Sequence, residues 1–229
     1  MKTIVCYGDS NTYGFNPLDG GRYEICWVDI VRANYKDDFV VNAGLNGRLA
    51  EPRQFLYDVT LRQYAPIGLL VIMLGTNNVD HLESVEHITV GLHVMLRRAL
   101  SKAEHILLLA PPYLRNDEER YQRSKELNKK LKVLADSFHA DFIDVEEVVS
   151  ELAFDGIHLT KKGHEQLGKT IVDYIKKSLL WIFLYAQKCY TLTLGGLRYD
   201  KEYDRRTSIK THYDVRIAFI IGKHIPADL

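Results

Sequence analysis

The segment Thr3-Ile4-Val5-Cys6-Tyr7-Gly8-Asp9-Ser10-Asn11 decides the fold class, because a short apolar run stops at a glycine and polar side chains follow at once. An apolar run bounded by turn residues is typical of a buried strand, and glycine permits a tight turn into a helix. Four later stretches repeat the pattern, at 39–43, 69–74, 105–110 and 141–145. We therefore predict five strands, the first over residues 3–7.

Amphipathic stretches separate the predicted strands. Apolar residues recur at helical spacing within 88–99, 127–138 and 167–179, which indicates helices packed against a core. Strands that alternate with helices form a parallel sheet covered on both faces. The sequence thus predicts an α/β fold, in which a ligand site lies at the carboxyl ends of the strands.

Composition excludes several classes of protein. The chain has 229 residues, of which 46% are hydrophobic, and 30 Lys and Arg balance 30 Asp and Glu. This balance argues against nucleic acid or an anionic membrane surface as a partner, since both require a basic excess. The longest apolar run, 179–186, is far shorter than the roughly 20 residues of a membrane span.

Cysteine usage and the N-terminus bear on compartment. Cys6, Cys26 and Cys189 are scattered and form no C-x-x-C pair, so neither a disulfide framework nor a thiolate metal site is indicated. The apolar run at residues 3–7 is too short for the core of a signal peptide. We therefore expect a cytoplasmic protein without a bound metal.

The alternation of strands and helices ends near residue 179. Residues 180–229 contain an apolar run, a Gly195-Gly196 turn, a charged and Tyr-rich stretch at 198–213 and a second apolar run at 217–221. Two or three strands or a hairpin would fit this pattern. We predict a main domain over 1–179 and a C-terminal extension over 180–229 that serves as a flap, an edge strand or a contact in a homo-oligomer.

Polar clusters follow three of the predicted strands. Ser10, after the first strand, is either the N-cap of a helix or a nucleophile facing unpaired backbone N–H groups, and taken alone the cap is favoured. The glycine-containing segment 42–48 follows the second strand and Gly75-Thr76-Asn77-Asn78 follows the third. Each of these two, taken alone, is best interpreted as a plain loop or turn.

The segment Asp155-Gly156-Ile157-His158 changes the balance. A serine nucleophile needs a base to accept its proton, and a neutral imidazole suits that role. The imidazole needs a carboxylate on its other nitrogen to fix its tautomer and orientation. Because Asp155 lies three positions before His158, one tight loop can supply both groups.

These four motifs, in this order, resemble those of the SGNH (GDSL-type) hydrolase family. The resemblance implies a flavodoxin-like three-layer α/β/α sandwich without a metal or organic cofactor. It also implies Ser10 as nucleophile, His158 as base and Asp155 as its orienting partner, with an oxyanion hole formed by the backbone N–H groups of Ser10 and Gly47 and the side chain of Asn77. One departure is Asn78, where the family usually has Asp, and we expect weaker local support for Asn77 there.

Segments 14–17 and 44–48 look like the arylesterase and acyltransferase branch of the family. This likeness favours short-chain esters, acetyl esters above all, as the small-molecule substrate, hydrolysed through an acyl-enzyme. Near the nucleophile, the candidate substrate contacts are Asn11, Tyr13 and Arg48, whose alternative role is packing or surface exposure.

Other functions stay open at this point. One is a long-chain lipase or lysophospholipase of the same family, with the apolar run at 179–186 as a lid. A second is a non-catalytic flavodoxin-like module whose Gly8-to-Thr12 loop, at the start of a helix, binds a phosphate. Such a module would need neither Asp155 nor His158. A third is a catalytically silent relative.

Overall fold

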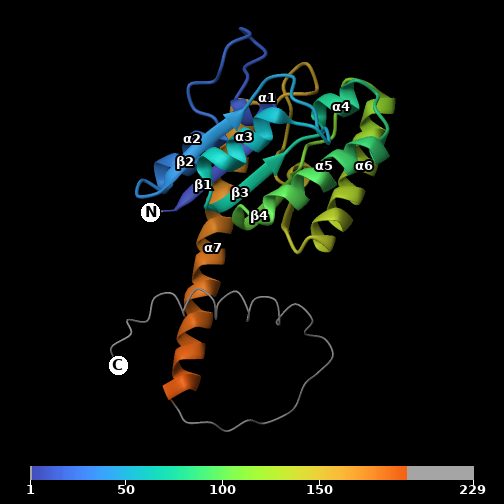
Figure 1. Cartoon of the computed structure of the whole chain (residues 1–229). Coiled ribbons are helices and arrows are strands. Elements are labelled where there is room, and N and C mark those ends of the chain that lie inside the picture. The colour runs from blue at the N-terminus through green and yellow to red at the C-terminus, as the bar shows by residue number, and fades with distance from the viewer. Residues whose placement is uncertain (1, 195–229) are drawn as a thin grey trace. The chain divides into compact units, whose positions relative to one another are not determined.

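The computed structural model describes residues 2–194 and contains one five-stranded parallel sheet (Figure 1). The strands are β1 (Thr3–Gly8), β2 (Phe39–Gly44), β3 (Ile67–Met73), β4 (Ala103–Ala110) and β5 (Asp141–Asp144), in the order β2-β1-β3-β4-β5. The predicted α/β fold with five parallel strands is therefore confirmed. Each strand lies within two residues of its predicted bounds.

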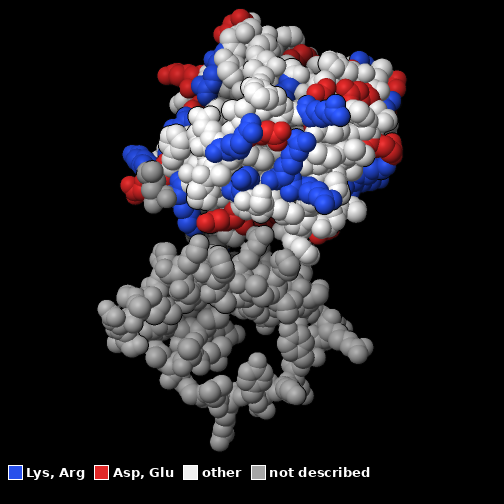
Figure 2. Space-filling model, viewed as in Figure 1, with Lys and Arg blue, Asp and Glu red and all other residues white. Residues whose placement is uncertain are grey.

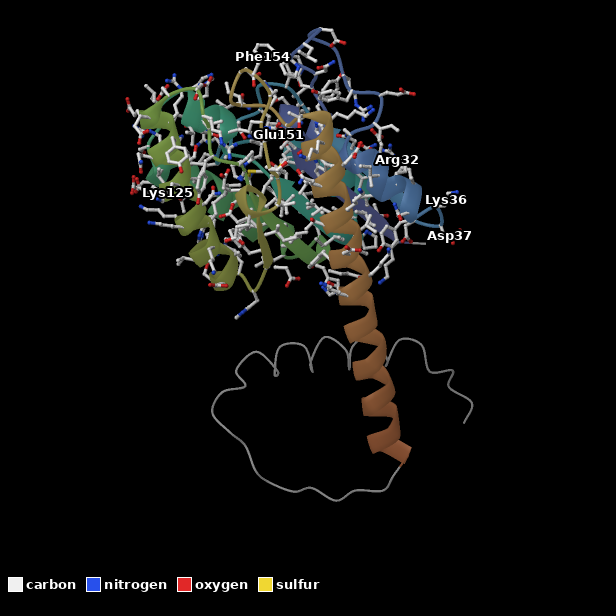
Figure 3. The ribbon with its side chains drawn as sticks, turned by 180° about the vertical axis from the view of Figure 1, so that it is seen from behind. Arg32, Lys36, Asp37, Lys125, Glu151 and Phe154 are labelled. Carbon is white, nitrogen blue, oxygen red and sulfur yellow. The ribbon has the colours of Figure 1, made fainter. Side chains whose placement is uncertain are left out.

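Helices cover both faces of the sheet. They are α1 (Ser10–Tyr13), α2 (Trp27–Asn34), α3 (Phe55–Tyr64), α4 (Thr76–Asp80), α5 (Val85–Ala99), α6 (Glu118–Ser137) and α7 (Lys161–Leu194), with a short 3-10 helix at Val145–Glu147. Helices α3, α5 and α6 share one core with the sheet. On the opposite face α2 lies beside α7, as Figure 3 shows with Arg32 marking α2, and the Tyr35 hydroxyl donates to the Val172 carbonyl at 3.1 Å.

Strand register aligns the carboxyl ends of the strands. Gly8 at the end of β1 pairs with Gly44 on one side and with Met73 on the other. Because polar segments follow each of these three positions, the register brings them to one edge of the sheet. The central strands β1, β3 and β4 are apolar and buried there because helices cover both of their faces.

The chain divides into two compact units, Met1–Tyr174 and Ile175–Leu229. Helix α7 continues to Leu194, so the expectation that strands begin at residue 180 is wrong for 180–194. Leu, Ala, Gln and Lys in this stretch favour a helix, and no Gly or Pro interrupts it before Gly195. The rest of the predicted extension, 195–229, lies outside the described residues.

The surface of the described residues mixes both signs of charge. Lys and Arg gather near the middle of the face formed by α3 and α5, with Asp and Glu beside them (Figure 2). Arg98 of α5 pairs with Asp58 of α3 at 3.1 Å, and a half-exposed pair of this kind contributes only about 0–1 kcal/mol. Across the part of the chain that the structure describes, we find no helix with the length and apolar character needed to cross a membrane.

Candidate active site

The turn after β1 presents Ser10 as the first residue of α1. Asp9, not Ser10, is the N-cap: its Oδ1 accepts a hydrogen bond from the Asn11 backbone N–H at 3.0 Å. The capping role that the sequence also offered to Ser10 is therefore taken by Asp9. This leaves the Ser10 hydroxyl, on a residue only 4% exposed, for another partner.

Two glycines let α1 lie directly on the strand ends. A Cβ atom at Gly8 would lie 2.1 Å from Thr12 Oγ1, and one at Gly44 would lie 2.1 Å from the backbone nitrogen of Tyr13. Only residues without a side chain permit this approach. Gly8 and Gly44 therefore allow α1, and with it Ser10, to lie close to the ends of β1 and β2.

The second contributor is the loop between the 3-10 helix and α7, marked by Glu151 and Phe154 in Figure 3. It closes on itself, because the Ala153 N–H donates to the His158 carbonyl at 2.7 Å. Gly156 adopts φ +68°, a left-handed conformation that glycine tolerates best. The turn places Asp155 and His158 side by side at its inner edge.

The structure brings the three predicted triad residues into one hydrogen-bonded row. His158 Nε2 lies 3.0 Å from Ser10 Oγ, and His158 Nδ1 lies 2.6 Å from Asp155 Oδ2. The other carboxylate oxygen, Oδ1, accepts the backbone N–H groups of Ile157 and His158, each at 3.0 Å. Every group in the row therefore has a partner before a substrate arrives.

Electrostatics set the direction of proton transfer along this row. Partial burial opposes ionisation of Asp155, but the His158 side chain and two backbone N–H groups outweigh it and lower the pKa of this carboxyl. A charged Asp155 assigns the proton of the neutral ring to Nδ1. The free electron pair of Nε2 then faces the Ser10 hydroxyl, the arrangement that a general base requires.

Asn11 holds the two halves of the row together. Its Nδ2 donates to the Ile157 carbonyl at 3.2 Å and its Oδ1 accepts the Leu159 N–H at 2.8 Å. Its own carbonyl accepts the indole N–H of Trp27 at 3.0 Å. Asn11 is buried, so the structure gives it a positioning role in place of the substrate contact that the sequence predicted.

Two aromatic residues follow Asn11 at the rim. The Phe15 ring lies 4.7 Å from the His158 ring, tilted by 50°, and so limits the positions that the imidazole can adopt. Tyr13 is half-buried, and the Arg22 guanidinium carbon lies over its ring at 5.9 Å from the ring centroid. A substrate contact for Tyr13 stays a prediction.

The predicted oxyanion donors lie on neighbouring segments. Gly47 adopts φ +75° in a turn closed by the Arg48 N–H, which donates to the Leu45 carbonyl at 3.2 Å. The backbone of Gly47 is exposed at this turn, and nothing lies within 4 Å of where its Cβ would be. Asn77, in the first turn of α4, donates from Nδ2 to the Arg48 carbonyl at 3.0 Å, which joins it to this loop.

Arg48 does not stand at the rim as the sequence predicted. Its guanidinium turns inward and donates to the Gly8 carbonyl at 2.7 Å and also to the Ala43 carbonyl. It lies over the Tyr7 ring, 4.0 Å from the centroid. Because a guanidinium only donates, its Nη1 group satisfies the carbonyls at the ends of β1 and β2.

Asp9 is a site residue that the sequence analysis passed over. Burial raises its pKa to about 6, while the Asn11 N–H and the charges of His158 and Arg48 act in the opposite direction. Asp9, next to Ser10, is therefore a carboxyl that takes up a proton at a higher pH than an ordinary aspartate does. The only signal for it was its place between Gly8 and Ser10.

Asn78, which stands where the family motif usually has an acid, is hydrogen-bonded through both side-chain atoms. It is fully buried, accepts the Ala50 N–H on Oδ1 at 2.8 Å and donates from Nδ2 to Glu83 Oε2 at 2.9 Å. The amide thus keeps the acceptor that a carboxylate would supply and adds a donor.

A metal site does not form in the described part of the chain, where no three His, Cys, Asp or Glu side chains converge suitably. The buried His164 packs edge-on against Tyr23, with 5.3 Å between the ring centroids. Burial lowers its pKa to about 4, so it is a neutral core residue at neutral pH.

Comparisons with known proteins agree with this geometry. Residues 6–166 match the model of the GDSL-like lipase/acylhydrolase family. No curated protein matches the chain.

Solved structures resemble the chain over most of its length. They include a lipase/acylhydrolase from Enterococcus faecalis (27% identity, TM-score 0.61, covering 78% of this chain and 97% of that one) and a carbohydrate acetylesterase from Sinorhizobium meliloti (25%, 0.70, 77% and 99%). The aryl esterase of M. smegmatis is 24% identical, with a TM-score of 0.69 and coverage of 77% and 99%. With its family motifs and the fold in agreement, the chain belongs to the GDSL-like lipase/acylhydrolase family of ester hydrolases.

Proposed function

We propose that this chain is a serine esterase that cleaves short-chain, acetyl-type carboxylic esters through an acyl-enzyme on Ser10. One observation carries the proposal: the continuous row from Ser10 Oγ through His158 to Asp155, with distances of 3.0 and 2.6 Å. A phosphate-binding module would not require this row, because phosphate binding needs neither His158 nor Asp155.

The first half of the reaction forms the acyl-enzyme. Ser10 Oγ attacks the ester carbonyl carbon while its proton passes to His158 Nε2. The developing oxyanion accepts hydrogen bonds from the backbone N–H groups of Ser10 and Gly47 and from Asn77 Nδ2. His158 then gives its proton to the leaving alkoxide, and the acyl group stays on Oγ.

The second half releases the acid. A water molecule takes the place of the alcohol beside His158, which accepts one of its protons as the water oxygen attacks the acyl carbon. The same donors hold the second oxyanion. As that intermediate collapses, His158 returns the proton to Ser10 Oγ and the carboxylic acid leaves.

The surroundings of Gly47 support a short acyl group. A hollow of about 320 Å³ opens beside it, with the apolar Leu45 and Phe55 facing the charged Glu51 and Arg53. Phe55 is 75% exposed, so the hollow is an open groove with a mixed lining. Such a lining suits a small ester with a polar or aromatic alcohol better than a long alkyl chain. Two solved relatives, an aryl esterase and a carbohydrate acetylesterase, support the same class of substrate.

The test is an ester series on the wild type and Ser10→Ala. We expect the rate with p-nitrophenyl acetate or butyrate to exceed that with the octanoate or laurate, and Ser10→Ala to lose turnover on all four. A fluorophosphonate probe should label Ser10 in the wild type, as located by peptide mass spectrometry.

Two results would count against the proposal. A preference for laurate over acetate would refute the short-acyl part and favour the lipase alternative. Full activity in pure Ser10→Ala protein would refute the mechanism.

A further inference from the structure

A closed set of hydrogen bonds surrounds Asn78 outside the catalytic row. Its side chain donates to Glu83 Oε2 at 2.9 Å, and its carbonyl accepts the Glu83 N–H at 2.9 Å. Its Oδ1 accepts the Ala50 N–H at 2.8 Å. Asn78 and Ala50 are each fully buried, so the bond between them is shielded from water, whereas the Glu83 side chain is 26% exposed.

This arrangement fixes the loop that carries Gly47. Two consecutive residues of α4 hold it, since Asn77 binds the Arg48 carbonyl and Asn78 binds the Ala50 N–H. Helix α5 presses on the same point, because a Cβ at Gly91 would lie 2.4 Å from the Ala50 carbonyl oxygen. The loop therefore leaves the core at a defined place, two residues after the turn of Gly47 and Arg48.

Two acceptors orient the Asn78 NH₂ group: the Glu83 carboxylate at 2.9 Å and, more weakly, the Ala50 carbonyl at 3.5 Å. A carboxylate only accepts hydrogen bonds, so it holds the NH₂ group toward itself. The amide oxygen must then face the Ala50 N–H. Without the carboxylate, the flipped amide would aim a donor at another donor and release the loop.

We propose that Glu83 is a positioning residue for ester hydrolysis: through Asn78 it holds the oxyanion loop in register with Asn77. The inference rests on the proposed function, which makes Gly47 and Asn77 oxyanion donors. It extends that function to a carboxylate that never touches the substrate.

The charges that face Glu83 come from two helices. His87 of α5 places Nε2 at 3.7 Å from Glu83 Oε2. Arg123 of α6 donates from Nη1 to the Glu83 carbonyl at 2.9 Å and from Nη2 to Glu119. Glu83 therefore has cationic or titratable neighbours on both helices that pack against it.

Placing a carboxylate at position 78, and then an amide at position 83, tests the inference. Asn78→Asp sets one carboxylate against another at hydrogen-bond distance, so we expect kcat to fall by about 10- to 100-fold near pH 8, a part of the roughly 10²–10³-fold cost of a lost donor. KM should change by less than about 3-fold, since the loop acts mainly on the charged transition state. The ratio of variant to wild-type kcat should rise as the pH falls, because the two carboxylates can then share a proton.

The double variant Asn78→Asp/Glu83→Gln provides the rescue. The amide introduced at position 83 can donate to the carboxylate introduced at position 78, which still accepts the Ala50 N–H. We therefore expect kcat to return to within about 3-fold of the wild type. Its ratio to the wild type should no longer depend on pH. A flat ratio for the single variant, or a double variant no faster than the single one, would overturn the inference.

Two further variants control for folding. Glu83→Leu removes the acceptor without adding a second carboxylate, and we expect a loss of kcat of about 10-fold or more. Wild-type kcat in that variant overturns the inference even if Asn78→Asp fails to fold. Glu119→Gln, which changes another partner of Arg123, should leave kcat and KM unchanged. If Ser10→Ala matches the wild type, the proposed function itself is wrong, and this inference falls with it.

Discussion

The two sides of the site are held by different means. On the nucleophile side, Ser10 comes from a buried turn and His158 from a half-buried loop, and Asn11 ties the two together through two backbone groups. On the oxyanion side, the exposed turn at Gly47 is held by hydrogen bonds from the loop to two side-chain amides, Asn77 and Asn78. The difference teaches that the row lies between two turns joined by one amide, whereas the oxyanion loop depends on the orientation of two amides. Substitutions in the row itself should therefore abolish activity, and substitutions among the groups that hold the row or the oxyanion loop should lower it by degrees.

The largest effect should come from the row itself. Ser10→Ala and His158→Ala should each lower kcat by up to about 10⁶-fold, and the double variant should lose little more, because the residues act as one unit. Stability should change little, so urea unfolding checks that the loss is chemical. Losses that multiply in the double variant would contradict a shared row.

On the oxyanion side we expect a smaller, separable loss. Asn77→Ala removes one donor and the bond to the Arg48 carbonyl, so kcat should fall by roughly 10²–10³-fold with little change in KM. Steady-state kinetics on p-nitrophenyl acetate measure both constants. A change confined to KM would show that Asn77 binds the ground state and would break the comparison.

Asn11 tests the link between the turns. Asn11→Ala leaves the Leu159 N–H and the Ile157 carbonyl unpaired, which should lower the free energy of unfolding by about 1–3 kcal/mol. It should also lower kcat by about 10-fold or more, because the imidazole loses its fixed position. Asn34→Ala, which removes an exposed amide bonded to its own helix, is the matched control and should change neither quantity much. An unchanged kcat would show that the His158 loop holds itself.

Asp9 should affect the pH dependence of stability rather than the size of kcat. Its pKa is raised to about 6 by burial, above the value of about 3.9 in an unfolded chain. The folded state therefore binds more protons between these values, and this group lowers stability as the pH rises from about 4 to 6. Asp9→Asn removes that dependence, so the stability of the variant relative to the wild type should grow over this range, by about 2–3 kcal/mol, and then level off. Urea unfolding at several pH values measures it, and a constant difference would show that Asp9 is ionised throughout.

Much of this architecture could be predicted from the sequence because its signals are local. Apolar runs bounded by turn residues indicated the strands, and the spacing of Asp155 and His158 indicated one loop that carries both groups. The end of the last core helix could not be placed in this way. Helical propensity carries α7 to Leu194, past the predicted change at residue 180.

Two of the predicted substrate contacts, Asn11 and Arg48, bind the protein itself in the structure. Asn11 and Arg48 stand beside functional residues in the sequence, but their side chains are bound to backbone groups brought close only by folding. A polar residue next to a nucleophile can face the substrate or the protein, and local sequence does not distinguish the two. Asp9 was missed for the same reason, since its burial depends on the neighbouring strands. The substrate contact of Tyr13 and the oligomer contact of the extension stay predictions.

The reach of the Asn11 side chain has a consequence for how this enzyme is made. It joins a residue near the start of the chain to a loop synthesised 146 to 148 residues later. A nascent chain that ended before Asp155 would contain Ser10 but neither His158 nor Asp155. By the proposed mechanism it could not hydrolyse esters. On the proposed mechanism, two fragments divided ahead of that loop should each be inactive and should hydrolyse esters only when they reassemble.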